Sequence, residues 1–429
     1  MNPYQTLKER GFVFQVTDEE AARSIFDRKR VSAYIGFDPT ADSLHAGSLV
    51  PIMALAHLQR CNHRPIALVG GGTGLVGDPS GKTELRKILG VEDIRRNAES
   101  LKRQFSRYIS FDADKALLLN NADWLSDLKY IAFLRDIGKH FSVNKMLTAE
   151  SVRQRLEKGL TFIEFNYMVL QAYDFYVLNR DWDCELQMGG QDQWGNIVAG
   201  IDLTRRIAGK EVFGVTFPLI VNSAGEKFGK SVKGAVGLAG GKTPPYEYYQ
   251  FFRNTTDSDV GRYLGYFTFI PMEEVRALAK LEPPLLNRAK EILAFEATKI
   301  THGEEEAKKA YLASVEQFGE ADPGRTVETS SSILTLTAGR AELPTITVNR
   351  EQLSAGFSIL DAFVSTGLCA SKGEARRLIR QGGGYIGDEP VKDENLLLTR
   401  SSFQDRSLTL RAGKKRHGVL TIADFERSV

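Results

Sequence analysis

Cysteines, long apolar runs and an excess of charge of one sign are all missing or scarce in this chain of 429 residues. The cysteines, Cys61, Cys184 and Cys369, are three in number, far apart, and form no C-x-x-C pair. This pattern argues against a disulfide framework and a cysteine zinc site, and it fits a reducing compartment such as the cytoplasm. Since no run of eighteen uncharged apolar residues occurs, no membrane span is expected.

The charge balance and composition are those of a globular protein. The formal net charge is +2, from 56 basic and 54 acidic side chains, so a nucleic-acid partner would have to bind a local basic patch. Hydrophobic residues make up 42% of the chain and charged residues 26%, which excludes a disordered chain. The N-terminal segment has early acidic residues and no long apolar stretch, unlike a signal peptide. The length predicts roughly two or three domains.

Short apolar runs alternate with helical patterns in the first 240 residues. Strands are predicted at Val31–Phe37, Pro65–Val69 and Glu185–Met188, each ending in a turn or in glycines. Helical spacing follows the first run from Leu49 and the third through Ile201. This order predicts an α/β fold with a parallel sheet and helices on both faces.

The rest of the chain divides into three parts. A helical pattern runs from Leu285 to Phe318, and the composition changes at Asp322–Gly324 to a stretch rich in Ser, Thr and Gly. We therefore expect an α/β domain over 1–235, a helical domain over 236–320, a linker over 321–353 and a small α+β domain over 354–429.

Two glycine-rich patterns suggest a nucleotide. Gly72–Gly77 matches G-x-G-x-x-G after a strand, which is typical of NAD enzymes, but Asp78–Pro79 interrupts the expected helix and no strand ending in an acid follows at the expected distance. Gly77–Thr83 is one residue short of a P-loop. The loop is either a surface turn or, beside Lys82 and Arg86, a site for phosphates.

Two further segments also fit phosphates. His45 lies between a predicted strand and helix, where it could donate to a phosphate, although Asp42 or Ser43 could equally cap the helix. The segment 221–234 carries three lysines among glycines, so it is either a solvated basic loop or one that closes over a polyphosphate.

An apolar helix predicted over Thr161–Leu178 carries a polar stripe. Glu164, Tyr167, Gln171 and Asp174 share one face, which has no lysine or arginine. The stripe is either an ordinary solvated face or a hydrogen-bonding wall for a small zwitterion, with Asp174 accepting from a hydroxyl.

Taken together and in order, these segments resemble bacterial-type tyrosyl-tRNA synthetase over nearly the whole chain. His45–Ser48 stands where class I aminoacyl-tRNA synthetases carry HIGH, and Lys227–Ser231 stands where they carry KMSKS. Further matching segments are Tyr34–Thr40, Tyr167-x-x-x-Gln171-x-x-Asp174 and Gln187–Asn196. The resemblance departs at Ser48, in place of the second histidine, and at Gln191, in place of a small residue.

The resemblance implies a Rossmann-like catalytic domain, a homodimer, and the two-step joining of L-tyrosine to tRNA(Tyr) with ATP and Mg²⁺, without zinc or a tightly bound cofactor. It implies tyrosine contacts from Tyr34, Asp78, Tyr167, Gln171, Asp174 and Gln187. It implies ATP contacts from Asp38, Thr40, His45, Gly47, Ser48, Asp192, Gln193 and Lys230. His45, Lys82, Arg86, Lys227 and Lys230 would surround the phosphates during catalysis.

The C-terminal part has two basic clusters. Lys372, Arg376 and Arg380 form one stripe of a helix predicted over Ser371–Arg380, and the second cluster includes Lys414 and Lys415. Such clusters are either solvated surface or contacts to an RNA backbone. The segment resembles the S4 RNA-binding domain, which favours RNA.

Three rival interpretations remain from the sequence. The Gly72 loop leaves room for an NAD-dependent oxidoreductase, and the altered Ser48 for a non-catalytic RNA-binding regulator. A tryptophan-specific relative is the nearest alternative, although Tyr34 with Asp174 favours a phenol.

Overall fold

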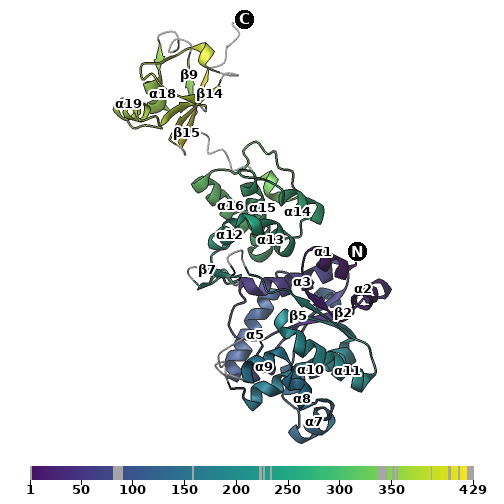
Figure 1. The fold of residues 1–429 in the computed structure, drawn as a ribbon. Coiled ribbons are helices and arrows are strands. Elements are labelled where there is room, and N and C mark those ends of the chain that lie inside the picture. Colours follow the sequence, from purple (N-terminus) through teal and green to yellow (C-terminus); the bar gives the residue numbers. More distant parts are fainter. Residues whose placement is uncertain are drawn as a thin grey trace. The chain divides into compact units, whose positions relative to one another are not determined.

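The computed structural model describes residues 2–80, 90–156, 159–221, 225, 228–231, 234–336, 345–349, 353, 356–387, 389–403, 407–413 and 416–422 (Figure 1). The chain forms two compact units. The first comprises Met1–Tyr311 and Ala321–Ser331, and the second comprises Leu312–Glu320 and Ser332–Val429. No helix within the described ranges is both long enough and apolar enough to span a membrane.

A six-stranded sheet forms the centre of the first unit, in the order β1-β6-β5-β2-β3-β4. The strands are β1 (Gln15–Val16), β2 (Ser32–Phe37), β3 (Arg64–Val69), β4 (Leu117–Asn120), β5 (Cys184–Gly190) and β6 (Phe213–Phe217). All neighbours are parallel except β1 with β6. The predicted α/β fold with a parallel sheet is confirmed, and β2 lies beside β5 although the two are far apart in the sequence.

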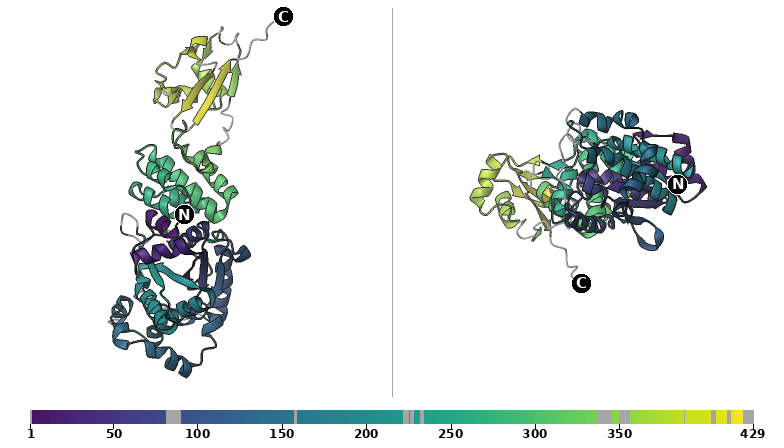
Figure 2. Two further views of the ribbon diagram at one scale, coloured as in Figure 1. Left: turned by 90° about the vertical axis from the view of Figure 1, so that its right-hand side faces the viewer. Right: turned by 90° about the horizontal axis from the view of Figure 1, so that it is seen from below.

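Helices cover both faces of this sheet, with α3 on one face and α10 and α11 on the other (Figures 1 and 2). The helices of this part are α1 (Pro3–Glu9), α2 (Glu19–Arg28), α3 (Leu49–Arg60), α4 (Thr73–Val76), α5 (Val91–Phe105), α6 (Ala122–Leu125), α7 (Tyr130–Asp136), α8 (Val143–Leu147), α9 (Glu150–Leu156), α10 (Phe162–Trp182) and α11 (Trp194–Ala208). Short β7 (Lys230–Ser231) and β8 (Gly234–Ala235) pair with each other.

Helix α10 begins where its sequence provides a cap. Thr161 accepts a hydrogen bond from the N–H of Glu164, and the carboxylate of Glu164 accepts one from the N–H of Thr161. The same carboxylate lies 3.1 Å from the buried Arg155 guanidinium. The Glu164 carboxylate therefore binds Thr161 and Arg155 at the start of the helix. Tyr167 and Asp174 of the predicted stripe instead face the pocket described below.

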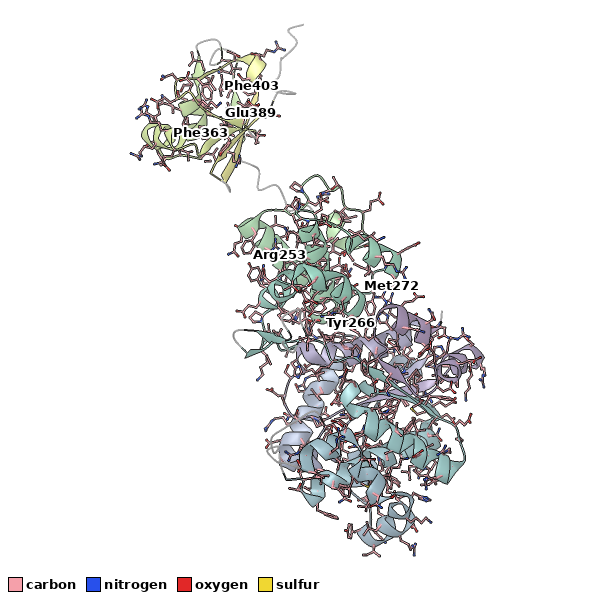
Figure 3. The ribbon with its side chains drawn as sticks, viewed as in Figure 1. Arg253, Tyr266, Met272, Phe363, Glu389 and Phe403 are labelled. Carbon is pink, nitrogen blue, oxygen red and sulfur yellow. The ribbon has the colours of Figure 1, made fainter. Side chains whose placement is uncertain are left out.

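A helical bundle completes the first unit: α12 (Pro245–Arg253), α13 (Val260–Phe267), α14 (Met272–Leu278), α15 (Leu286–His302) and α16 (Glu304–Phe318), the last of which extends into the second unit. The guanidinium of Arg10 donates to the carbonyls of Gly265, Thr268 and Ile270 at 2.6–3.0 Å. Tyr266, labelled in Figure 3, donates to the carbonyl of Gly11. These buried bonds fasten the bundle to the N-terminal segment.

The second unit is a small α+β fold. Its five-stranded sheet has the order β12-β11-β14-β15-β9, with β9 (Thr345–Val348), β11 (Gly384–Ile386), β12 (Glu389–Pro390), β14 (Ser407–Ala412) and β15 (Arg416–Ile422). Helices α18 (Ile359–Ser365) and α19 (Lys372–Arg380) pack with the core around Phe363, and β10 (Phe357–Ser358) pairs with β13 (Leu397–Leu398).

The predicted linker over 321–353 contains structure at both ends. Thr329 and Ser330 donate to Glu274, and Ser331 donates to Glu296, so residues up to 331 are attached to the first unit. At the other end, β9 pairs in parallel with β15, so the sheet includes a strand upstream of residue 354. The division into four parts remains a prediction.

Candidate functional site

A pocket of about 380 Å³ opens at the carboxyl ends of β2 and β5. Parallel sheets place ligand sites at such strand ends, because the following loops and helix starts converge there. Predicted residues that line it are Tyr34, Asp38, Thr40, His45, Gly47, Ser48, Asp78, Tyr167, Gln171, Asp174, Gln187, Asp192 and Gln193. The structure thus gathers residues from five separate segments into one cavity.

The inner end of the pocket contains buried polar atoms without partners. Tyr34 and Gln187 are 1% and 2% exposed, and neither the Tyr34 hydroxyl nor the Gln187 carbonyl oxygen has a hydrogen-bond partner among the described residues. Burial and the nearby Asp174 carboxylate raise the pKa of Tyr34, which therefore stays protonated. Because an unpaired buried polar group is costly, these atoms favour a polar ligand.

Asp174 is the buried carboxylate of this inner end. Its two oxygens accept hydrogen bonds from the Asn121 amide at 2.9 Å and from the Trp124 indole at 2.8 Å. Burial, with Asp38 nearby, raises the pKa of Asp174 to about 7, whereas the two donors lower it. Neither donor is predicted from the sequence. The apolar run Leu117–Leu119 followed by two asparagines is a signal for Asn121, since polar residues at strand ends face such pockets, but no comparable signal indicates Trp124.

Asp38 lies at the centre of a second set of contacts. Thr73 donates to its carboxylate at 3.1 Å, and the Tyr167 hydroxyl lies 3.3 Å from it. Asn121 in turn donates to the Thr73 hydroxyl at 2.9 Å. A continuous chain of hydrogen bonds therefore links Asp174 to Tyr167 through the middle of the pocket.

Asp78 is the third carboxylate and is also buried. It accepts from the Gln193 amide at 2.7 Å and from the N–H of Ser80 at 2.9 Å. Burial and the neighbouring Asp38 raise its pKa to about 6. Gln171 donates to Gln193 at 3.3 Å, so this wall of the pocket is a connected network. Among the described lining residues, four aspartates face a single basic side chain, His45, and the pocket favours a cationic group.

The two segments that resemble HIGH and KMSKS meet at the pocket entrance. A Cβ on Gly229 would lie 2.7 Å from the backbone nitrogen of Gly47, and Gly229 has a φ of +88°, so both space and conformation require glycine there. The carbonyl of Gly229 accepts from Val236, whose own carbonyl accepts from Ala46. The HIGH-like and KMSKS-like segments are therefore connected by backbone hydrogen bonds through Val236.

Phe228 anchors the segment 221–234, which carries three lysines and is called the lysine segment below, to the helical bundle. Phe228 stacks on Phe267 at 4.8 Å with an interplanar angle of 11°, and it meets Tyr263 edge-on at 4.9 Å. Phe251 and Phe252 lie 5.3 and 6.0 Å from the same ring. Phe228 thus gives this segment an apolar contact that its lysines and glycines do not indicate.

Several predicted residues lie outside the described parts. These are Lys82, Arg86, Lys227, Lys414 and Lys415, and for Lys230 only the backbone is described, as part of β7. Their roles at phosphates and RNA stay predictions.

The Gly72 loop does not have the geometry of a dinucleotide site. Its helix, α4, has only four residues and ends at Gly77 with a φ of +87°. The side-chain amide oxygen of Asn121 accepts hydrogen bonds from the backbone N–H groups of Gly72 at 2.8 Å and of Thr73 at 3.4 Å. Since a protein oxygen occupies these donors, they are not available to a pyrophosphate.

The two departures from the resemblance differ in their surroundings. Ser48 lines the pocket. Gln191 does not, because its side chain accepts a hydrogen bond from the N–H of Leu219 at 3.1 Å. Gln191 therefore joins the end of β5 to the segment after β6.

The basic stripe of α19 has acidic partners within its own unit. Lys372 lies 2.6 Å from Asp361, and Arg380 and Arg376 lie 2.7 and 3.5 Å from Glu394. All three basic side chains are exposed. A phosphate backbone on this stripe would have to compete with these two carboxylates.

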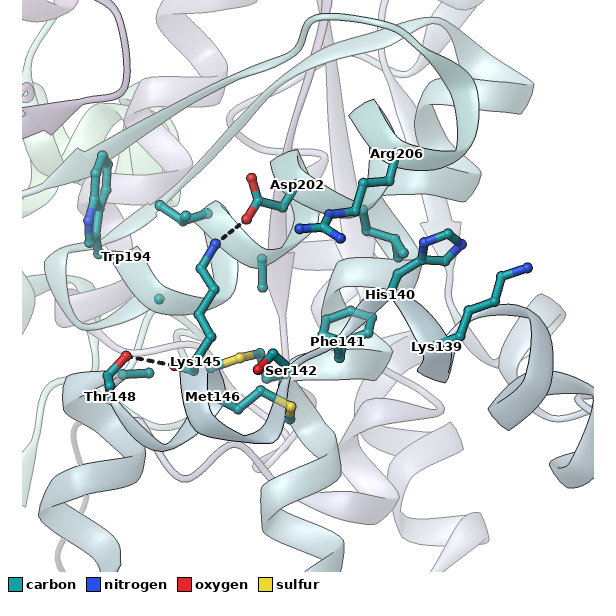
Figure 4. A pocket seen from close by; sticks show the side chains of 16 residues that line it. Lys139, His140, Phe141, Ser142, Lys145, Met146, Thr148, Trp194, Asp202 and Arg206 are labelled. Atoms are coloured by element: carbon teal, nitrogen blue, oxygen red, sulfur yellow. Dashed lines mark hydrogen bonds and ion pairs between the residues drawn. The ribbon is translucent and has the colours of Figure 1, made fainter.

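A second pocket, of about 310 Å³, lies between α8 and α11 (Figure 4). Met146 and Met168 contribute apolar surface, and the ammonium of Lys145 forms an ion pair with Asp202 across it. None of the predicted site residues whose side chains are described lines this pocket.

Comparison with known proteins identifies the family. Residues 27–319 match the family model for tRNA synthetases class I (W and Y), and residues 335–420 match that for the tyrosine–tRNA ligase SYY-like C-terminal domain.

Curated relatives match over almost the whole chain. The chain is 53% identical to the tyrosine–tRNA ligase of Desulfatibacillum aliphaticivorans, covering 99% of both chains. It is 50% identical to that of Clostridium tetani, covering 98% of this chain and 99% of the relative. A C-terminally truncated mitochondrial tyrosyl-tRNA synthetase from Aspergillus nidulans has a similar structure, with 30% identity, a TM-score of 0.67, and coverage of 74% of this chain and 94% of that one. The chain therefore belongs to the tyrosine–tRNA ligases, within the class I tRNA synthetases for tryptophan and tyrosine.

Proposed function

We propose that the pocket at the ends of β2 and β5 binds L-tyrosine and ATP and joins them, and that the tyrosyl group then passes to the terminal ribose of tRNA(Tyr). The observation that carries this proposal is the pairing of an ionisable buried Asp174 with the unpartnered Tyr34 hydroxyl at the closed end of the pocket. A phenol hydroxyl can donate to the first and accept from the second. Phenylalanine would leave both unpaired, and this enzyme class is the standard example of such selectivity.

The ammonium group of tyrosine is proposed to bind nearer the entrance. Asp78 provides a buried carboxylate, while Tyr167 and Gln171 provide a hydroxyl and an amide on the same helix face. Gln187, whose side-chain oxygen has no partner at the inner end of the pocket, is the remaining proposed tyrosine contact. An ammonium group supplies the positive charge and the donors that these acceptors need.

ATP is proposed to bind along the edge that carries the HIGH-like segment. The contacts would come from Asp38, Thr40, His45, Gly47, Ser48, Asp192, Gln193 and Lys230. The tyrosine carboxylate would attack the α-phosphorus, forming a carboxyl–phosphate bond and releasing pyrophosphate. Because the substrate carboxylate is the nucleophile, the protein contributes positioning and cations. His45, Lys82, Arg86, Lys227 and Lys230 are the proposed cations and donors.

Mg²⁺ is proposed to arrive with ATP. The described residues include no group of three His, Cys, Asp or Glu side chains that could hold a metal ion. Mg²⁺ commonly takes most of its ligands from substrate phosphates and water. Its contribution is to neutralise charge on the polyphosphate.

The tRNA is proposed to contact the second unit through Lys372, Arg376, Arg380, Lys414 and Lys415. Arg411 of β14 lies opposite His417 of β15, and Ala412 lies opposite Arg416, so further basic residues adjoin Lys414 and Lys415 in the sequence. Phosphate contacts of this kind are electrostatic and weaken with added salt.

A homodimer acting in the cytoplasm is also proposed. Exposed large apolar side chains concentrate on α7 to α10, which pack around one apolar cluster. Ile131 is 74% exposed and Phe162 is 70% exposed. Exposed apolar side chains on neighbouring helices suit contact with a second copy of the chain. None of the three cysteines forms a disulfide, which fits a reducing compartment.

Tyrosine-dependent exchange of pyrophosphate into ATP tests the central proposal. Asp174→Ala should lower kcat/KM for tyrosine by about 2–5 kcal/mol, as expected for removal of one partner of a buried charged hydrogen bond. Asp181→Ala, in the exposed last turn of the same helix, is the matched control. Unchanged activation in Asp174→Ala contradicts the assignment. Tryptophan-dependent exchange, or NADH binding measured by fluorescence, would favour the corresponding rival.

A further inference from the structure

Helix α5 carries two amide side chains within the stripe that it buries. Ile94, Leu101 and Phe105 are the apolar residues of this stripe, and Asn97 and Gln104 lie among them at spacings of three and four residues. The two amides are 8% and 6% exposed. An apolar side chain would fill either position with no polar group to satisfy, so the amides need hydrogen-bond partners inside the protein.

The partners of both amides include backbone groups of the turn over 38–45, which follows β2. The Asn97 amide donates to the carbonyl of Pro39 at 3.0 Å. The Gln104 side-chain oxygen accepts from the N–H of Leu44 at 3.0 Å, and its NH₂ group donates to a carbonyl two residues earlier at 3.3 Å. Two residues of α5 that are two helical turns apart therefore hold the 38–45 turn near both of its ends.

The other side of the same turn lines the pocket. Asp38, Thr40, Leu44 and His45 are all lining residues, whereas neither amide of α5 is. The turn therefore lies between α5 and the edge of the pocket that is proposed to bind ATP. A hydrogen bond from α5 acts on the pocket only through the backbone of this turn.

The backbone of Leu44 is bound on both of its sides. Its N–H donates to Gln104, and its carbonyl accepts from the N–H of Leu238, which follows the lysine segment, at 2.8 Å. His45 is the next residue, and it pairs with Gly237 in an isolated antiparallel bridge. Gln104 thus supplies the bond that fixes the chain immediately before His45 on the side of α5.

We propose that Gln104, assisted by Asn97, is a positioning residue that sets the place of His45 through the backbone of Leu44, and so determines the use of ATP but not the binding of tyrosine. This inference rests on the proposed role of His45 at ATP. The proposed tyrosine contacts come from other segments, so they do not depend on the turn. Neither amide touches the reacting atoms.

The test removes the hydrogen bonds and keeps the burial. Gln104→Met and Asn97→Leu nearly preserve side-chain size but leave backbone groups of the turn without partners. Misplacing a group by about 1 Å can cost on the order of a hundredfold in rate, and since the turn keeps its other bonds we expect about a tenfold loss of kcat/KM for ATP in Gln104→Met. Asn97→Leu should lose less, because Asn97 has one bond to the turn that an alternative anchor, Gln104, partly replaces.

Two measurements separate the use of ATP from tyrosine binding. Tyrosine-dependent pyrophosphate exchange at varied ATP gives kcat/KM for ATP, and equilibrium dialysis gives the Kd for tyrosine. In Gln104→Met the Kd for tyrosine should change by less than about twofold while kcat/KM for ATP falls. A general loss of structure would instead weaken both.

Two matched controls remove buried hydrogen bonds of the same kind elsewhere. Gln59 of α3 donates to the carbonyl of Ser110 at 2.6 Å and accepts from its N–H at 2.9 Å. Asn179 of α10 donates to the carbonyl of Cys184 at 2.9 Å, at the end of β5 away from the pocket. Gln59→Met and Asn179→Leu should lower Tm but keep the parent kcat/KM for ATP.

A double-mutant cycle with His45→Ala tests whether Gln104 acts through His45. Gln104→Met should cost about tenfold in the parent but less than about twofold in the His45→Ala background, because the group that it positions is then absent. An equal loss in both backgrounds, a parent value in Gln104→Met or an equal loss in the controls overturns the positioning role. If Gln104→Met does not fold, Gln104→Asn replaces it, since the shorter side chain keeps the amide and withdraws it from the turn.

Failure of the proposed function gives a different result. Full kcat/KM for ATP in His45→Ala overturns the proposed role of His45, on which the inference rests. A parent enzyme without tyrosine-dependent exchange overturns the proposed function as a whole. With both of these intact, the behaviour of Gln104→Met decides the inference alone.

Discussion

The aromatic anchor of the lysine segment gives a prediction whose size follows from the structure. Phe228 is half-buried and contacts four rings of α12 and α13. Replacing a fully buried phenylalanine by alanine costs about 3–5 kcal/mol, and each aromatic pair adds about 0.5–1.5 kcal/mol to area burial. For a half-buried ring we expect Phe228→Ala to weaken the anchoring of the segment by about 2 kcal/mol.

That loss should appear mainly in the rate of adenylate formation. If Lys227 and Lys230 meet the phosphates in the transition state, the loss of about 2 kcal/mol of anchoring corresponds to a decrease in kcat of about thirtyfold. The affinity for tyrosine should change little, because its proposed contacts come from other segments. Rapid-quench measurement of adenylate formation gives kcat, and equilibrium dialysis gives the affinity.

Phe269→Ala is the matched control. Phe269 is also half-buried, and its ring contacts His57 at 5.2 Å and Arg60 at 4.3 Å, away from the lysine segment. Both variants should lose thermal stability, but only Phe228→Ala should lose kcat. A folded Phe228→Ala enzyme with the parent kcat, or an equal loss in the control, refutes the anchoring role.

Four further outcomes are expected. Lys230→Ala should lower kcat more than tyrosine affinity, and the reverse result in equilibrium dialysis and exchange assays would make Lys230 a ground-state contact. The pKa of Asp174 is raised from 3.8 to about 7 in the native protein, so the native state binds more protons than the unfolded state between these two pH values. The free energy of unfolding should therefore fall as pH rises from 3.8 to about 7, by at most on the order of 4 kcal/mol. Asp174→Asn should reduce the difference in Tm between pH 5 and pH 8. Ile131→Asp should shift the sedimentation coefficient toward the monomer while Val91→Asp, 65% exposed on α5, does not. A chain ending at Leu336, before β9, should form adenylate at nearly the intact rate but charge tRNA poorly, and full aminoacylation by it would exclude an RNA role for the second unit.

The lengths of the apolar runs and the helical spacing of polar residues predicted much of the fold and many of the residues that line the pocket. The strands before Asp38 and Gln191 are short apolar runs with abrupt ends, and the helical spacing of Tyr167, Gln171 and Asp174 places them on one side of α10. Glu164 shares that spacing but binds Arg155 and caps the helix, because a carboxylate in a first turn satisfies free N–H groups.

Other features depend on contacts between distant segments, which spacing does not reveal. Asn121 reaches Asp174 only because β3 and β4 are neighbours, and Phe228 finds its partners in helices that follow it in sequence. The Gly72 pattern wrongly suggests a dinucleotide site for the same reason. The side chain of Asn121, which binds the N–H of Gly72, lies 49 residues further along the chain.

The excess of aspartates in the pocket has a consequence for how the two substrates affect each other. Asp38, Asp78, Asp174 and Asp192 face one histidine among the described lining residues, so these carboxylates oppose the binding of a polyphosphate. A bound ammonium group cancels part of that repulsion, and tyrosine should therefore raise the affinity for ATP. Thermodynamic linkage requires the converse by the same factor. On this reasoning the two substrates should bind cooperatively within a single chain, because the ammonium group of the amino acid offsets negative charge that the nucleotide meets.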